Sequence, residues 1–171
     1  MEYERKYLVD PAREFGVQGL PCEIYQGYIA IDELAEVRVR ILTDAMMQKS
    51  ATLCVKERRL GAVRKEYELD VPVCDAEEML ELASNRILQK KRWKWDGGDG
   101  GEWILDVFEG RLHGLVLAEW ECSTSEAVLR GPSMLSKSIV REVTEDPHFR
   151  NHYLATADGL TVASLVGSRA V

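Results

Sequence analysis

The stretch MEYERKYLV, residues 1–9, opens the chain and decides how the rest is interpreted. If it forms a β-strand, successive side chains point to opposite faces of the sheet. Glu2, Glu4 and Lys6 then share one face, while the aromatic residues and Arg5 share the other. Carboxylates two residues apart on a strand lie about 6–7 Å from each other and repel, so this face looks either into water or at a cation.

The same two-residue alternation recurs along the chain between turn residues, which predicts a mostly antiparallel sheet. The expected strands cover residues 2–9, 23–31, 35–43, 50–58, 63–72, 88–96, 102–110, 115–123 and 139–144. No internal repeat, low-complexity tract or linker interrupts this pattern, so one β-rich domain is expected.

The clearest helix is predicted from about 76 to 87, where Asp75 can cap the first turn and Glu78 completes a capping box. Its apolar stripe comprises Met79, Leu80, Ala83 and Ile87. Helices are also expected near 132–137 and 147–156, because each segment begins with a proline that suits the first helical turn.

Two short patterns have competing interpretations. GGDGG at 97–101 could cradle a phosphate, but it lacks the following helix and the Lys-Ser/Thr pair of a P-loop, so a hairpin loop is favoured. His148 and His152 lie one helical turn apart and could bind a metal. Because no third ligand lies nearby in the sequence, a solvated helix face is the favoured interpretation.

Size and composition narrow the class of protein. At 171 residues the chain can bury a proper core, and its net charge of -7 disfavours a general binder of nucleic acids or membrane surfaces. The cysteines are widely spaced without a Cys-x-x-Cys pair, so free thiols in a reducing compartment are expected, with a secreted disulfide framework as the alternative. The N-terminus is too charged for a signal peptide, and no apolar run approaches the roughly 20 residues of a membrane span. We therefore expect a cytoplasmic protein.

Like charges gather within single predicted strands. The basic sets are Arg38 with Arg40 and Lys90 with Arg92; the acidic sets are Glu2 with Glu4, Glu66 with Glu68, and Glu119 with Glu121. A solvated sheet face would explain any one pair. Such a face tends to mix signs, however, because opposite charges across strands attract. The faces behind these charges are often apolar, which favours a barrel with charges inside and apolar faces outside, under helices.

A charged barrel interior has a chemical consequence. Unpaired buried charges are too costly for a dry interior, so the barrel would enclose a wet tunnel that holds a ligand of both signs. Carboxylate pairs suit hard divalent cations such as Mg²⁺ or Mn²⁺. Arginine and lysine suit an anion with many oxygens. A metal-bound oligophosphate meets both requirements.

These residues resemble the CYTH, or triphosphate tunnel metalloenzyme, superfamily. Glu2-x-Glu4-x-Lys6 matches its Glu-x-Glu-x-Lys signature, and further blocks follow in the family's order. Those blocks are QGYI (26–29), VRVR (37–40), the VKE lysine (Lys56), RKEYE (64–68), KKR (90–92), WILDVFEG (103–110), LAEWE (117–121) and EVTEDPHFRN (142–151). The resemblance implies a tunnel domain over residues 1–155, with 156–171 as a C-terminal tail that packs on the barrel or stays mobile.

The resemblance implies an α+β, mainly β fold: a closed eight-stranded antiparallel β-barrel with helices packed outside. The implied metal ligands are Glu2, Glu4, Glu119 and Glu121. Glu66, Glu68 and Asp106 are implied to join them directly or through water. The implied substrate-binding residues are Tyr28, Arg38, Arg40, Lys56, Lys90, Arg92 and Arg141. Lys6 is implied as the catalytic residue that positions or activates the attacking water, or holds a phosphate. It could act as a base only if its pKa fell from about 10.4.

The expected activity is hydrolysis of a short linear triphosphate, foremost inorganic tripolyphosphate, with Mg²⁺ or Mn²⁺ as cofactor. No added domain or aromatic pocket for a base is evident in the sequence. Alternatives are an adenylate cyclase, a nucleoside or thiamine triphosphatase, and a non-catalytic module that binds polyphosphate or nucleotides. KKRWKW at 90–95 suggests nucleic-acid contact, but alternation separates its basic residues from its tryptophans. The expected partner is therefore a small triphosphate, without nucleic acid or membrane, and a homodimer is compatible with apolar outer faces.

Overall fold

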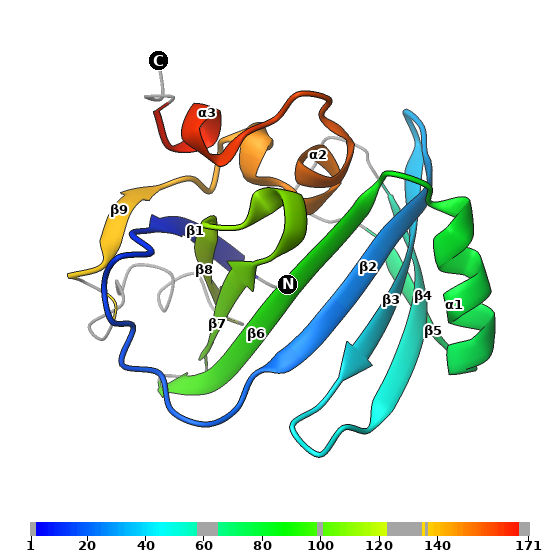
Figure 1. The fold of residues 1–171 in the computed structure, drawn as a ribbon, viewed down its shortest axis with the longest axis horizontal. Coiled ribbons are helices and arrows are strands. Elements are labelled where there is room, and N and C mark those ends of the chain that lie inside the picture. The colour runs from blue at the N-terminus through cyan, green and yellow to red at the C-terminus, as the bar shows by residue number, and fades with distance from the viewer. Residues whose placement is uncertain (1–2, 58–64, 99–100, 123–134, 136, 168–171) are drawn as a thin grey trace. The chain divides into compact units, whose positions relative to one another are not determined.

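The computed structural model describes residues 3–57, 65–98, 101–122, 135 and 137–167, and these form a mainly antiparallel β structure with few helices (Figure 1). The chain divides into two compact units, which we describe separately. The terminal unit comprises Met1–Pro21, Lys90–Arg150 and Gly159–Val171. The central unit comprises Cys22–Gln89 and Asn151–Asp158.

The strands of the terminal unit are consecutive neighbours in the order β6-β7-β8-β1-β9, and the pairs described between them are antiparallel. They are β1 (Tyr3–Val9), β6 (Ile87–Gly98, whose first residues belong to the central unit), β7 (Gly101–Phe108), β8 (Val116–Cys122) and β9 (Ile139–Glu142). Its short helices are the 3₁₀ turns η1 (Gly110–Leu112) and η3 (Pro147–Phe149) and the helix α3 (Val162–Gly167).

An aromatic cluster forms the apolar face of the terminal unit. Trp103 lies at its centre, with its ring centroid 4.9 Å from that of Trp120 and 6.0 Å from that of Tyr7. Glycine is required at 97 and 101, because a Cβ there would lie 2.0 Å and 2.2 Å from the Trp120 ring. Phe15, Val17, Ile139 and Leu135 pack against this cluster. Among the described residues, the side chains that cover this face come from non-helical segments, where helices were expected.

The central unit contains four strands in the order β5-β4-β3-β2, again antiparallel. They are β2 (Cys22–Ile31), β3 (Ala35–Thr43), β4 (Lys49–Glu57) and β5 (Glu66–Val71). Its helices are α1 (Val73–Leu82) and α2 (Asn151–Thr156). Helix α1 lies along the apolar face of the sheet, where Ala76 and Leu80 join Val39, Ile41 and Ala51 in one buried cluster (Figure 1). Here the expected outer helix is confirmed.

Helix α1 differs from its prediction at both ends. It begins at Val73, and Pro72 holds the N-cap position without a side-chain hydrogen bond, so the capping box of Asp75 is wrong. The proline starts the helix one turn earlier than the polar residues indicate. The helix ends at Leu82 because Ser84 adopts a left-handed φ of 54°. The predicted apolar stripe is confirmed within α1 for Met79 and Leu80. Ala83 is buried at the C-cap, whereas Ile87 lies in β6, from which it packs against the same cluster.

The expected strands are all present among the described residues, with ends shifted by up to three residues. The hairpin interpretation of 97–101 is confirmed by the antiparallel pairing of β6 with β7 up to Gly98 and Gly101, although residues 99–100 lie outside the described residues. The helix expected at 132–137 lies mostly outside them too. The helix expected at 147–156 divides into η3 and α2 at Arg150.

A closed eight-stranded barrel is not confirmed. Neither run of strands closes on itself within the described residues, and the sheet has nine strands because β9 adds to β1. All four cysteines are free thiols, as expected. None of the helices in the described part of the chain has the length and apolar character needed to cross a membrane.

Candidate functional site

The charged residues of the terminal unit lie on the sheet face opposite the tryptophans. In an antiparallel ladder, residues directly opposite each other share a face and their side chains interact. The pairing of β1 with β8 sets Lys6 opposite Glu119 and Glu4 opposite Glu121. The structure thus brings together the first and the last predicted metal-binding strands, which are far apart in the sequence. Glu2 lies outside the described residues.

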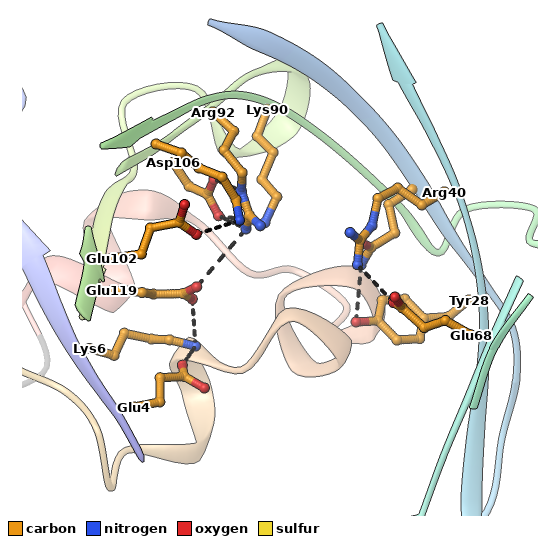
Figure 2. A network of polar contacts seen from close by, with 12 residues as sticks. Glu4, Lys6, Tyr28, Arg40, Glu68, Lys90, Arg92, Glu102, Asp106 and Glu119 are labelled. Atoms are coloured by element: carbon orange, nitrogen blue, oxygen red, sulfur yellow. Dashed lines mark hydrogen bonds and ion pairs between the residues drawn. The ribbon is translucent and has the colours of Figure 1, made fainter. Parts of the chain in front are cut away.

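Lys6 is the cation that the opening stretch requires. Its Nζ lies 2.9 Å from Oε1 of Glu119 and 3.1 Å from Oε1 of Glu4 (Figure 2). Burial alone would lower the pKa of Lys6, but attraction by Glu119 and Glu4 and hydrogen bonds to them outweigh it, so the pKa is raised. Lys6 therefore keeps its proton in this arrangement, which suits holding an anion better than accepting a proton.

Asp106 holds two of the predicted phosphate-binding cations. Lys90 Nζ donates to Oδ2 of Asp106 at 2.5 Å, while Arg92 donates through Nε to Oδ1 and through Nη2 to Oδ2, both at 2.7 Å (Figure 2). The side chains of Lys90 and Asp106 are only 1% and 2% exposed. Both carboxylate oxygens of Asp106 are thus engaged by cations, and its side chain is more deeply buried than those of the predicted acids Glu4, Glu66, Glu68 and Glu119.

Burial and charge shift the pKa values of this triad in opposite directions. Burial, together with repulsion by Arg92, lowers the pKa of Lys90 to about 8 despite the attraction of Asp106. Burial would raise the pKa of Asp106, but the two cations hold it well below its usual range. Asp106 is consequently ionised at neutral pH, whereas Lys90 loses its charge just above neutrality.

A row of carboxylates crosses the sheet of the terminal unit. It runs over four neighbouring strands through Asp96, Glu102, Glu121 and Glu4, each opposite the next. Sequence reasoning did not single out Asp96 or Glu102. The signal was present, because Glu102 is an even number of residues from Asp106 and so shares its face. Lys94 Nζ lies 2.6 Å from Oε2 of Glu102 and balances part of this charge.

The central unit carries a second charged face, on β3, β4 and β5. Nη2 of Arg38 lies 2.9 Å from Oε1 of Glu66 and 3.3 Å from Oε1 of Glu68. Lys56 Nζ lies 2.8 Å from the other oxygen of Glu66, and Arg40 Nη2 lies 3.9 Å from Glu68. The three predicted cations of this unit are therefore gathered with the two predicted acids, and Figure 2 shows Arg40 beside Glu68 and Tyr28.

Cys54 is a member of this face that the sequence did not reveal as such. Within the described part of the chain, Cys54, Glu66 and Glu68 are the only group of three metal-type ligands whose atoms lie within 4.8 Å of one another. Burial raises the pKa of Cys54 to about 11, and its thiol donates to Oε1 of Glu66 at 3.1 Å. The thiol thus stays protonated, and the oxygens of the two glutamates are the ligands that remain for a hard cation.

Tyr28 and its neighbour Gln26 complete the charged face on β2. Both side chains are buried, and β2 pairs Gln26 with Arg40 and Tyr28 with Arg38. Burial raises the pKa of Tyr28, so its phenol stays protonated. Gln26 lies in the quoted QGYI block, but a neutral amide gave no charge signal that sequence reasoning could use.

The two histidines do not form a metal pair. Nδ1 of His148 lies 2.7 Å from Oδ1 of Asp146, an exposed contact next to η3. Nδ1 of His152, on α2, lies 3.2 Å from Oε2 of the buried Glu36. The solvated face is thus confirmed for His148, whereas it is wrong for the largely buried His152, which packs toward an acid of β3.

Arg141 contacts the segment that follows β9 and the helix α3. Its Nη1 lies 3.6 Å from Oδ2 of Asp146, and its Nη2 donates to the Leu165 carbonyl of α3 at 3.4 Å. Its guanidinium carbon also lies 5.2 Å from the centre of the Phe149 ring. In this arrangement Arg141 ties the C-terminal helix to the segment after β9.

The chain is similar in sequence and in fold to known inorganic triphosphatases. No family model matches the chain. The inorganic triphosphatase of Acetivibrio thermocellus is 38% identical over 90% of this chain and 92% of its own length. The inorganic triphosphatase of Nitrosomonas europaea is 29% identical over 90% and 96%. The crystal structure of the inorganic triphosphatase NE1496 superposes with a TM-score of 0.65 at 29% identity and covers 92% of this chain and 95% of that one.

The identity and coverage of the first relative, together with this pattern of charged antiparallel strands, establish the class. The chain belongs to the CYTH, or triphosphate tunnel metalloenzyme, superfamily. Its relatives within that superfamily include the inorganic triphosphatases of Acetivibrio thermocellus and Nitrosomonas europaea.

Proposed function

We propose that this chain is a divalent-metal-dependent inorganic triphosphatase that hydrolyses a short linear triphosphate, foremost tripolyphosphate. The observation that carries the proposal is the buried triad of Lys90, Arg92 and Asp106 in a chain 38% identical to a named inorganic triphosphatase. Two cations in a buried position require an anionic counterpart, because an uncompensated buried charge is costly. Asp106 supplies one negative charge, and Glu119, whose Oε2 lies 4.0 Å from Nη2 of Arg92, is shared with Lys6, so a phosphate oxygen would complete the balance.

Each unit carries cations that could bind a phosphate group. The proposed phosphate-binding residues are Tyr28, Arg38, Arg40, Lys56, Lys90 and Arg92. Guanidinium groups donate in a fixed fork that matches phosphate oxygens, and lysines act as point charges. We assign Asp106 the role of holding Lys90 and Arg92 in place rather than binding a metal directly, since its oxygens accept from them in an almost fully buried position, whereas Glu66 is 31% exposed. Arg141 would act indirectly, through α3.

The acidic residues fit a hard divalent cation such as Mg²⁺ or Mn²⁺, because carboxylate oxygens are the ligands that such cations prefer. The residues that would hold cations are Glu2, Glu4, Glu119 and Glu121 in the terminal unit, and Glu66 and Glu68 in the central unit. Bound there, the cation would neutralise charge on phosphate oxygens and make water more acidic.

Lys6 would bind a phosphate oxygen and so orient the phosphoryl group that is transferred. Its ammonium is held by Glu4 and Glu119, and its raised pKa keeps it charged through the reaction. Phosphoryl transfer depends on positioning and on stabilising the charge that spreads over the equatorial oxygens. Arg92 and Lys90 would supply that stabilisation from a buried position, where electrostatic interactions are strong.

The remaining parts of the proposal rest on the family resemblance. They are a closed eight-stranded tunnel over residues 1–155, the tail 156–171, and a cytoplasmic location. A homodimer is compatible with this arrangement.

The test is a substrate panel with the purified chain: tripolyphosphate, ATP and thiamine triphosphate, each with Mg²⁺ and with Mn²⁺. We expect phosphate release from tripolyphosphate to be fastest, and we expect Glu4→Gln and Lys6→Ala to reduce kcat by about 100-fold or more, as loss of a charged active-site group does. Cyclic AMP with pyrophosphate from ATP would indicate a cyclase instead. Absence of phosphate release from every substrate would refute the hydrolase, and tight tripolyphosphate binding in that case would indicate a binding module.

A further inference from the structure

Gln26 is a buried amide in the middle of the charged face of the central unit. It is 1% exposed and lies on β2 directly opposite Arg40 of β3. Its Oε1 accepts a hydrogen bond from Nε of Arg40 at 3.3 Å, and its Nε2 donates to Oη of Tyr28 at 3.2 Å. One side chain thus connects two residues that we assign to phosphate binding.

The chemistry of the partners determines how this amide is oriented. A guanidinium only donates hydrogen bonds, so the Gln26 oxygen must face Arg40. The NH₂ group of Gln26 then faces Tyr28, and the phenolic oxygen must act as an acceptor. No other orientation of the amide satisfies both partners.

The hydroxyl hydrogen of Tyr28 is consequently directed elsewhere. Burial raises the pKa of the phenol, so it stays protonated. A hydroxyl has one hydrogen to donate. Because the Gln26 amide already donates to its oxygen, Tyr28 can direct that hydrogen only toward an acceptor, and phosphate oxygens are strong acceptors.

We propose that Gln26 is a positioning residue that directs the Tyr28 hydroxyl and the Arg40 guanidinium toward one phosphate group of the substrate. This inference rests on the proposed function. The amide acts through its two neighbours and does not itself need to contact the substrate. Its neutrality matters, because a carboxylate at position 26 would accept the Tyr28 hydrogen and withdraw it from the phosphate.

The test is a double-mutant cycle of Gln26→Met and Tyr28→Phe, with KM and kcat measured for tripolyphosphate. Methionine keeps the length of glutamine and removes both hydrogen bonds. We expect each single variant to raise KM about tenfold with little change in kcat, the effect of losing a hydrogen bond to a charged group. The double variant should be no worse than the weaker-binding single variant, because the two residues act as one unit.

Two further variants make the test specific. Gln48→Met, at an exposed turn position, should leave KM and kcat unchanged. Gln26→Glu should raise KM at least as much as Gln26→Met although it keeps the shape of the side chain. If Gln26→Met does not fold, Gln26→Glu replaces it in the double-mutant cycle.

A merely structural role for Gln26 predicts a lower melting temperature with an unchanged KM, and that result would overturn the inference, as would additive KM effects in the cycle. If the wild-type chain releases no phosphate, the proposed function fails separately. The same cycle is then measured as Kd for tripolyphosphate by calorimetry, with the same criteria.

Discussion

The charged faces of the two units are built differently. In the terminal unit, Lys90 and Asp106 are almost completely buried and close-packed with Arg92. In the central unit, Glu66 and Glu68 are 31% and 49% exposed. They lie on β5, the outermost strand in the order β5-β4-β3-β2. Charges interact more strongly in a buried, low-dielectric position than at a solvated edge. The terminal triad is therefore suited to stabilise charge during reaction, and the central face to bind and release phosphate groups.

The largest expected effect follows from removing the carboxylate charge of the buried triad. Asp106→Asn leaves Lys90 and Arg92 buried without their counter-ion, so we expect the free energy of unfolding to fall by about 3–5 kcal/mol. Urea denaturation measures this change. A variant as stable as the wild type would show that the triad is not buried in solution, and the contrast between the two faces would disappear.

A packing variant tests the rigid support behind the terminal face. Gly101→Ala would place a methyl group 2.2 Å from the Trp120 ring, and Trp103 stands behind that ring. We expect a loss of about 1–3 kcal/mol in unfolding free energy, as for other overpacked cores, together with altered near-ultraviolet circular dichroism. Gly167→Ala is the matched control, since nothing lies within 4 Å of its added Cβ. Equal stability of the two variants would contradict the close packing of Trp120.

The pKa of Lys90 predicts a pH dependence that belongs to the terminal face alone. As the pH rises through about 8, Lys90 loses its charge. KM for tripolyphosphate should then rise by up to about tenfold, the effect of one lost charge-assisted hydrogen bond. Lys90→Met should show a higher KM at neutral pH and no such rise, whereas a rise retained in this variant would assign the titration to another group.

The same pKa has a stability consequence of defined sign. An unfolded lysine titrates near a pKa of about 10.4, so between about pH 8 and 10.4 the unfolded chain binds more protons than the folded one. The contribution of Lys90 to the free energy of unfolding should therefore increase as the pH rises from about 8 to 10.4. Denaturation of wild type and Lys90→Met across the window measures the difference.

The smallest effect is expected from the same carboxylate-to-amide change on the central face. Glu68→Gln weakens half-exposed contacts with Arg38 and Arg40. Exposed ion pairs contribute about 0–1 kcal/mol, so the unfolding free energy should change by less than 1 kcal/mol. A loss as large as that of Asp106→Asn would remove the distinction between the two faces.

Much of the fold could be predicted from local pattern. Alternation with period two located every strand of the described chain, because opposite orientation of neighbouring side chains is a property of the extended backbone itself. The start of α1 was missed because Pro72 takes the N-cap position where the polar pattern favoured Asp75. That choice depends on how β5 leads into the helix, which the helical pattern alone does not contain.

The prediction drawn from like charges within a strand was incomplete. It required a bound ligand as their counter-ion, whereas neighbouring strands already supply opposite charges. Lys94 meets Glu102, Arg92 meets Asp106, and Lys56 meets Glu66. What separates these faces from an ordinary solvated sheet is the burial of several of their members, not a lack of partners.

Position along an extended strand is enough to predict which residues share a face, and the family signature at Glu4 and Lys6 is visible in the chain directly. The folded structure, in contrast, establishes which charges meet and how deeply they are buried: Lys6 lies between Glu4 and Glu119, and Asp106 holds two cations. The reason is that strand order and register bring distant segments together, and the pKa of a charged group depends on those neighbours and on its exclusion from water.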